Sequence, residues 1–208
     1  MHRKVFSLFL LTLFLLAAGL SVQAQTPAQA ETKEDDTNLE TQLYMILGTN
    51  QDVADSKIPA SLDPVIKQLR ATLPFKNYRL AATLVNRVKN EGRLELGWVG
   101  APLTSAVDPV QPTTRSSFRI RHIKLARNSE GQSMVQVAGF AFNASIPFPV
   151  AGAVAANNPA VPVFNYEGTS LSTDISMREG EPVIVGTLNV GPSGDAIILV
   201  LAAKKTAR

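Results

Sequence analysis

The spacing of apolar and polar residues changes several times along the chain, and each change predicts a different element. The first is a short apolar run at residues 43–47, closed by Gly48. A run of this length favours a buried strand, although its periodicity leaves open a helix that begins near Asn38. We take a strand as the first element of the folded part of the chain.

A helical period follows between Ser61 and Leu73. Ser61 can cap the helix, Asp63 and Pro64 suit its first turn, and Pro74 ends it. The apolar residues of this segment recur on one face, namely Leu62, Val65, Ile66, Leu69 and Leu73. The sequence therefore predicts one main amphipathic helix that packs on a sheet.

From Tyr78 to Trp98 the period changes to two. A turn at residues 90–92 separates two alternating segments, 78–88 and 94–98, which predicts a hairpin with one face in the core. Trp98 falls in the apolar register of its strand, so we expect a core anchor rather than a platform for a ligand.

A second hairpin is expected around the turn at residues 128–131, between strands at 118–126 and 133–142. The apolar face of the first strand changes between Ile120 and Ile123. Such a change requires a β-bulge or a strand that is covered on both sides.

The C-terminal segment also alternates with a period of two. Strands are expected at 171–177 and 183–190, joined as a hairpin by a turn that contains Glu and Gly. After another turn at 191–194, residues 196–203 are almost continuously apolar. This last run predicts a central strand with both faces covered.

Residues 146–163 contain four prolines around small apolar residues. We expect a long loop here, and loops of this length are often functional. Its apolar residues are candidate contacts for a partner, namely Val150, Ala151, Val154, Ala155 and Val161.

Together these elements predict an α+β fold, with a strand-rich antiparallel sheet, one main amphipathic helix and a β-rich C-terminal half. The proline-containing segment 100–117 is expected to link a small α+β domain at 39–99 to a β-rich domain at 118–208. Residues 25–38 are acidic and have almost no large apolar side chains, which predicts a flexible spacer.

Residues 1–24 have the three parts of a secretory signal peptide: a basic start, an apolar run from Val5 to Leu20, and the small-x-small site that ends at Ala24. The apolar run is shorter than the roughly 20 residues that a spanning helix needs. We therefore expect cleavage between Ala24 and Gln25 and no stable transmembrane anchor afterwards. The mature protein is expected in the periplasm or outside the cell, with association with the outer membrane as one destination.

The composition narrows the chemistry of the mature chain. Loss of residues 1–24 removes Arg3 and Lys4 from the 20 basic residues, which leaves 18 against 17 acidic ones. Such a balance does not provide the positive surface that nucleic acids attract. The chain has no cysteine, and His122 is the sole histidine after cleavage, so the usual zinc sites and hydrolase triads lack their residues. We expect no catalytic residues, no metal and no cofactor.

The segment from Asp174 to Leu188 contains a strand, a charged turn with Gly180-Glu181, and a Val/Ile-rich strand that includes Gly186. This order resembles the core domain of the secretin family of outer-membrane secretion and pilus channels. The expected strand-helix-strand-strand order of residues 42–99 looks like the ring-building domains that precede that core. Family members are normally several times longer, so the resemblance implies an accessory or degenerate module rather than a gated channel.

Two functions are expected from these observations. The first is an exported, non-catalytic interaction or assembly module of the cell envelope, accessory to a secretion or pilus system, which binds a protein partner or forms a homo-oligomer through exposed strand edges. The alternative is a periplasmic carrier that holds a small apolar ligand under residues 146–163. An enzyme that uses carboxylates is a third class, but its candidate acids fall in turns, where acidic residues are ordinary.

Overall fold

The computed structural model describes residues 37–52, 58–100, 103, 113–155, 158–191 and 194–206. The chain divides into two units, residues 1–35 and 36–208, and all described residues belong to the second. The predicted signal peptide, its cleavage site, nearly all of the acidic spacer and most of the predicted linker lie outside the described residues. Within the described ranges, no helix is long and apolar enough to cross a membrane.

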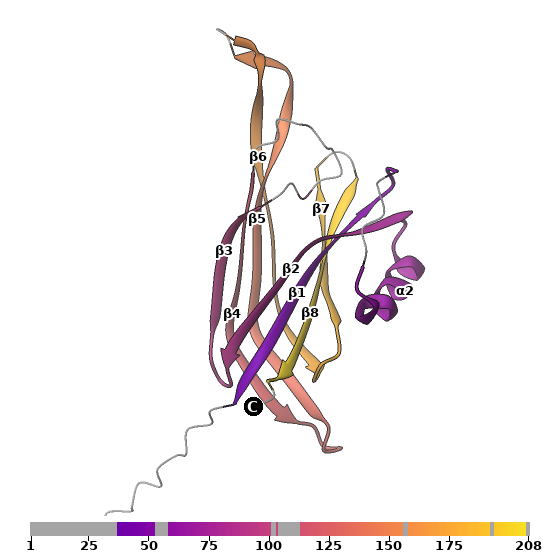
Figure 1. Cartoon of the computed structure of the whole chain (residues 1–208), viewed down its shortest axis with the longest axis vertical. Coiled ribbons are helices and arrows are strands. Elements are labelled where there is room, and N and C mark those ends of the chain that lie inside the picture. The colour runs from indigo at the N-terminus through magenta and orange to yellow at the C-terminus, as the bar shows by residue number, and fades with distance from the viewer. Residues whose placement is uncertain are drawn as a thin grey trace, which may run out of the picture. The chain divides into compact units, whose positions relative to one another are not determined.

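Eight strands form two antiparallel sheets of four strands each (Figure 1). The first sheet has the order β2 (Asn77–Lys89), β1 (Asn38–Thr49), β8 (Asp195–Lys205), β7 (Val183–Val190). The second has the order β3 (Leu94–Gly100), β4 (Thr114–Arg127), β5 (Ser133–Ala155), β6 (Asn158–Arg178). With one α-helix in the described ranges, α2 (Asp63–Thr72), the protein has the β-rich α+β fold that the sequence predicts.

One hydrophobic core lies between the two sheets. The first sheet contributes alternate residues of β1 and β8, such as Leu43, Met45 and Leu199, and the second contributes Phe118 and Phe140 among others. These five side chains are at most 1% exposed. Because residues from both sheets form this core, the two sheets pack face to face as a sandwich.

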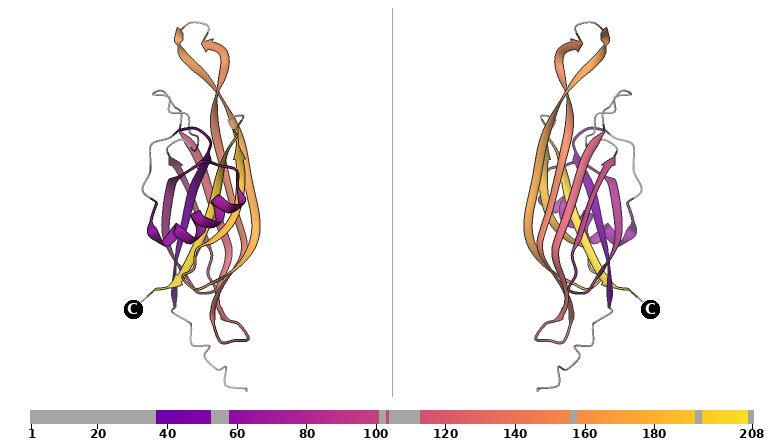
Figure 2. Two further views of the ribbon diagram at one scale, coloured as in Figure 1. Left: turned by 90° about the vertical axis from the view of Figure 1, so that its right-hand side faces the viewer. Right: turned by 90° about the vertical axis from the view of Figure 1, so that its left-hand side faces the viewer.

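A second core covers the opposite face of the first sheet, where α2 (Asp63–Thr72) lies across the strands (Figure 2). Ile46 of β1 and Val200 of β8 point to this side and are fully buried. Their neighbours Met45 and Leu199 point to the other core. The central, doubly covered position predicted for residues 196–203 is therefore confirmed.

The predicted amphipathic face of the helix is confirmed, but its predicted cap is wrong. Leu62, Val65 and Leu69 are buried, and Ile66 and Leu73 pack beside them. A 3-10 turn, η1 (Ala60–Leu62), precedes α2 and takes up the residue expected as the cap, so Leu62 stands at the N-cap and no side chain bonds there.

The hairpin predicted at 78–98 does not form, because β2 pairs with β1 and β3 pairs with β4. The turn between β2 and β3 carries the chain from one sheet to the other. Its backbone bonds to β4 instead: the N–H of Glu91 donates to the carbonyl of Ile123 at 2.8 Å, and the N–H of Ile123 donates to the carbonyl of Gly92 at 3.1 Å.

The hairpin predicted at 171–190 is wrong for the same reason. β6 pairs with β5, and β7 pairs with β8. In the connecting turn, the N–H of Glu179 donates to the carbonyl of Ser133 in the second sheet, at 3.1 Å. The next N–H, that of Gly180, donates to the carbonyl of Ala203 in the first sheet, at 2.7 Å. This turn therefore ties the two sheets together.

The β4–β5 hairpin is confirmed, and so is the bulge that the change of face requires. Ile120 and Ile123 are both fully buried, while Arg121 and His122 between them are both exposed. The irregularity lies in β5, where Gly139 has a φ of 64° and the register with β6 shifts. A positive φ is the conformation that favours glycine at such a bulge.

The two domains predicted at 39–99 and 118–208 are not separate in this structure. The C-terminal strand β8 lies between β1 and β7, and β3 pairs with β4. Both predicted domains therefore contribute strands to both sheets and residues to one core. Period-two patterns show where strands lie but not which strands pair, so they do not reveal that strands on both sides of 100–117 share the two sheets.

The loop predicted at 146–163 is also corrected, because these residues are mostly strand. The pairing of β5 with β4 ends at Ser145, but the pairing with β6 continues from Ile146 and Glu167 to Ala155 and Asn158. Residues 146–155 and 158–167 therefore form a two-stranded extension, here called the ribbon, which continues past the ends of β3 and β4 (Figure 1). Prolines are tolerated there because each strand of the ribbon is an edge strand.

Candidate strand-pairing interface

The predicted interaction residues all fall on the ribbon. Val150 is 42% exposed on β5. Ala151, Val154 and Ala155 follow on the same strand, and Val161 lies on β6. The structure describes only the backbone of these four. It brings the predicted residues together on one extension, although as paired strands rather than as a loop.

The base of the ribbon is fixed to the sandwich. Ile146 is 2% exposed, and Phe148 packs against the core between the sheets. A Cβ at Gly191, in the β7–β8 turn, would collide with the ring of Phe148, so the two residues are in close contact. The base of the ribbon is therefore packed on the sandwich.

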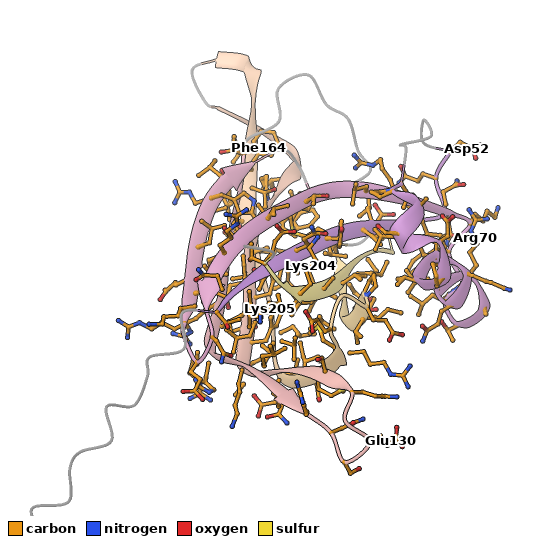
Figure 3. All side chains as sticks on the ribbon, turned by 60° about the horizontal axis from the view of Figure 1, so that its bottom comes forward. Asp52, Arg70, Glu130, Phe164, Lys204 and Lys205 are labelled. Carbon is orange, nitrogen blue, oxygen red and sulfur yellow. The ribbon has the colours of Figure 1, made fainter. Side chains whose placement is uncertain are left out.

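One stretch of backbone next to this base is suited to pairing with another strand. Residues Val163–Ser170 of β6, here called the β6 edge, lie on the outermost strand of the second sheet. Val163 is 38% exposed and Tyr166 is 46% exposed, and Glu167 is the one charged residue of the segment. Figure 3 labels Phe164 on this edge and Glu130 in the β4–β5 turn, at the opposite ends of β5 and β6.

The other outer strands are less suited to such pairing. β2 carries Arg79, Arg87 and Lys89, and charged residues on an edge oppose the addition of a strand. β3 has seven residues and β7 has eight, and β7 is interrupted by a register shift before Gly186. β6 has 21 residues and is the longest of the four edge strands.

Within the ribbon, the free side of β5 is also less receptive than that of β6. Pro147 and Pro149 stand two residues apart in β5, so their backbone nitrogens face the same side of the strand. Proline has no N–H to donate, and within sheets it is placed where the ladder does not need one. These two prolines therefore remove donors from the outer side of β5 and leave β6 as the receptive edge.

The residues considered for catalysis or cofactor binding lie elsewhere. His122 is exposed on β4, opposite Ala138 of β5. Among the described residues, no three His, Cys, Asp or Glu side chains are grouped so that they could hold a metal. Trp98 contacts Phe118 edge to face, with ring centres 6.4 Å apart, and packs on the core as expected.

Among the described residues, Glu40 and Tyr78 have shifted pKa values, and both lie in the first sheet, whereas the β6 edge belongs to the second. A hydrogen bond from Lys204 lowers the pKa of Glu40, and Gln42 adds a second one. Burial raises the pKa of Tyr78, against a smaller opposing effect of Arg70. Both groups lie in the first sheet or beside α2, and both serve the fold.

Sequence reasoning missed the β6 edge itself. Residues 164–170 follow the proline-containing segment and were not assigned to any element. The available signal was the continuation of β propensity from Val163 through Phe164, Tyr166 and Thr169, in a segment with almost no charge. Prolines on the N-terminal side obscured this signal.

In comparisons with known proteins, only solved structures match this chain. No protein-family model matches the sequence, and no curated protein matches it. Among solved structures, the Salmonella type III injectisome secretin InvG aligns with 83% of this chain and 65% of its own, at 10% identity and a TM-score of 0.38.

Two further secretins align in the same way. The V. cholerae type IV competence pilus secretin PilQ aligns with 83% of this chain and 58% of its own, at 8% identity and a TM-score of 0.37. The Klebsiella pneumoniae type II secretion outer-membrane complex with PulD aligns with 83% of this chain and 39% of its own, at 11% identity and a TM-score of 0.35. This chain thus spans less than two thirds of the length of these matched chains, and its similarity to the secretin family is a weak structural resemblance.

Proposed function

We propose that this chain is a non-catalytic interaction or assembly module of the cell envelope, which receives a strand of a protein partner at the β6 edge. The observation that carries the proposal is the combination of length, low charge and exposure along Val163–Ser170, next to the base where Phe148 packs on the core. Each backbone group on an unpaired edge can bond to an added strand, so the edge supplies affinity without a pocket.

Side chains along the edge supply the specificity of this contact. Successive residues of a strand point to opposite faces, so a partner strand would meet Val163 and Asn165 on one face and Tyr166 on the other. Cross-strand pairs of aromatic and β-branched residues contribute about 0.2–1 kcal/mol each. The partner we expect is therefore a strand with apolar residues opposite Val163 and Tyr166.

The setting that we propose for this partner is the space outside the cytoplasmic membrane. The signal-peptide pattern of residues 1–24 supports export, and the absence of cysteine requires the core alone to hold the fold. A secretion or pilus apparatus is the proposed host, which neighbouring genes for its components would support. No specific observation on the described residues favours the alternative role as a carrier of small apolar ligands.

A crosslinking experiment tests the proposal. Since the chain has no cysteine, Asn165→Cys gives a single attachment point on the β6 edge for a photoactivatable crosslinker. Ser129→Cys, in the β4–β5 turn at the far end of β5, is the matched control. We expect one envelope protein, or a second copy of the chain, to crosslink at position 165 in a fixed ratio and not at position 129. Equal capture at both positions, or capture at neither, would contradict the proposal.

A further inference from the structure

A hollow on the outer face of the second sheet gathers positive charge. It has a volume of about 670 Å³ and is lined by residues of the paired strands β3 and β4 and of the turn before β3, namely Arg93, Leu94, Glu95, Arg119, Ile120 and Arg121. In the register of these strands Leu94 pairs with Ile120, and Glu95 pairs with Arg119. Since Ile120 is fully buried, its neighbours Arg119 and Arg121 point to the outer face.

The charges of this hollow are not balanced from within. Three arginines face one carboxylate, that of Glu95. In the described part of the chain, none of the three arginines has a carboxylate oxygen within the 4.0 Å of an ion pair. Asp174 on β6, across the bulge, accepts a hydrogen bond from the N–H of Gly139 at 2.5 Å. The hollow therefore keeps a net positive charge, because Glu95 can offset only one of its three arginines.

The bulge in β5 holds one of the three arginines in place. Arg121 stands between Ile120 and His122, whose partners on β5 are Phe140 and Ala138, so Gly139 lies opposite Arg121. A Cβ at Gly139 would collide with Nε and Cζ of Arg121. The guanidinium group thus rests across the bare backbone of Gly139. A cation positioned before a ligand arrives loses less freedom on binding.

We propose that this hollow, here called the arginine hollow, binds a phosphate-bearing anion. The planar guanidinium group matches phosphate oxygens in pairs, and arginine is the residue most used for this purpose. Three arginines against one glutamate favour a ligand with more than one negative charge over a single carboxylate. The volume falls within the range of about 300–1,000 Å³ that is typical of ligand sites.

The arginine hollow is separate from the β6 edge. β3 and β6 are the two opposite outer strands of the second sheet. Loss of one function need not affect the other, so the two proposals can fail independently. For an exported protein, the phosphate can come from a free phosphorylated compound or from the head group of an anionic lipid.

Titration of the exported chain tests the proposal, with inorganic pyrophosphate in one arm and phosphatidylglycerol vesicles in the other. Vesicles of phosphatidylcholine provide the control surface. We expect saturable binding in at least one arm, and the arm that binds identifies the source. The double variant Arg119→Gln with Arg121→Gln should weaken binding by more than about tenfold, since hydrogen bonds to charged groups contribute about that factor each.

Two further variants make the result decisive. Arg178→Gln removes an exposed arginine at the end of β6, outside the hollow, and should bind as the unchanged protein does. Glu95→Gln removes the opposing carboxylate and should tighten binding, which keeps the test valid even if the double variant folds poorly. Absence of saturable binding in both arms, an unchanged affinity of the double variant, or an equal loss with Arg178→Gln would overturn the proposal.

Discussion

The backbone N–H of Gly139 donates a hydrogen bond to Oδ1 of Asp174, at a distance of 2.5 Å. This contact ties the bulge of β5 to the outer strand β6, at the point where the register between the two strands shifts. Arg121 of β4 rests against Gly139 at this bulge. One local irregularity therefore shapes the arginine hollow and anchors the strand that carries the β6 edge.

The substitution Gly139→Ala should destabilise the fold by more than about 2 kcal/mol. A positive φ costs an L-residue about 1–2 kcal/mol, and the added methyl group also displaces the Arg121 side chain. Gly131→Ala is the control, because Gly131 has a φ of 78° with nothing within 4 Å of a Cβ. Urea unfolding measures both. Equal losses for the two variants would show that Arg121 does not rest on Gly139.

The substitution Leu69→Asp should cost several kcal/mol, whereas Lys67→Asp should cost little. Leu69 is 1% exposed in the core under α2, and an unpaired carboxylate there would lose its hydration. Lys67 is exposed on the opposite side of the same helix. The midpoints of denaturant unfolding compare them, and similar small shifts for both variants would contradict the packing of α2 on the first sheet.

Tyr78 should titrate at a higher pH in the folded protein than a free tyrosine does. Its hydroxyl donates to the carbonyl of Leu69 at 3.0 Å, and burial raises its pKa above the ordinary value of 10.0. Because the folded-state pKa is the higher one, the stabilisation is complete below pH 10 and is lost as the pH rises through that pKa. The ultraviolet absorbance of tyrosinate measures the transition. Tyr78→Phe should remove the late phase, and a late phase that persists in this variant would refute the assignment.

The pKa of Glu40 reports directly on the pairing of the first and last strands. Nζ of Lys204 on β8 lies 3.2 Å from Oε1 of Glu40 on β1, and this contact lowers the pKa of the carboxyl group. A lowered folded-state pKa stabilises the fold above the ordinary value of 4.5, and the contribution is lost as the pH falls through the folded-state pKa.

In a titration followed by NMR, Lys204→Ala should therefore raise the pKa of Glu40 towards 4.5, and Lys205→Ala should change it little. Figure 3 shows both lysines at the end of β8. A pKa of Glu40 that does not respond to Lys204→Ala would mean that β1 and β8 do not pair in this register.

The sequence predicted the elements better than their pairing. The helical period from Leu62 to Leu69 correctly predicted a helix buried on one face, and the continuous apolar run of β8 correctly predicted a strand buried on both faces. In both cases the positions of the apolar residues follow directly from which faces are buried. Pairing depends on turns, and similar Glu-Gly turns have different outcomes here. The turn at Gly131 closes a hairpin, whereas those at Gly92 and Gly180 carry the chain between sheets. Their backbone partners are remote in sequence, so no local pattern distinguishes them.

Composition directed attention to the ribbon as a candidate interface. The apolar residues from Val150 to Val161 remain predicted contacts, but the loop predicted for them from their prolines is wrong, because the segment is mostly strand. Prolines at 147 and 149 are compatible with a strand only because β4 ends before them and leaves β5 with one neighbour. Whether these prolines can lie in a strand therefore depends on where β4 ends, and the sequence of the ribbon alone does not show this.

Proline substitution at two neighbouring positions, Thr169 and Ser170, tests the central claim most directly. Backbone N–H groups alternate in direction along a strand, so one of these two faces β5 and the other faces the free edge. The variant whose proline faces β5 should lose stability, and the other should keep its unfolding midpoint. The measurement is the crosslinking yield at position 165 for the stable variant, relative to the unchanged chain. We predict that the yield is lost although the fold is intact; full crosslinking by a stable proline variant would contradict the addition of a strand at the β6 edge.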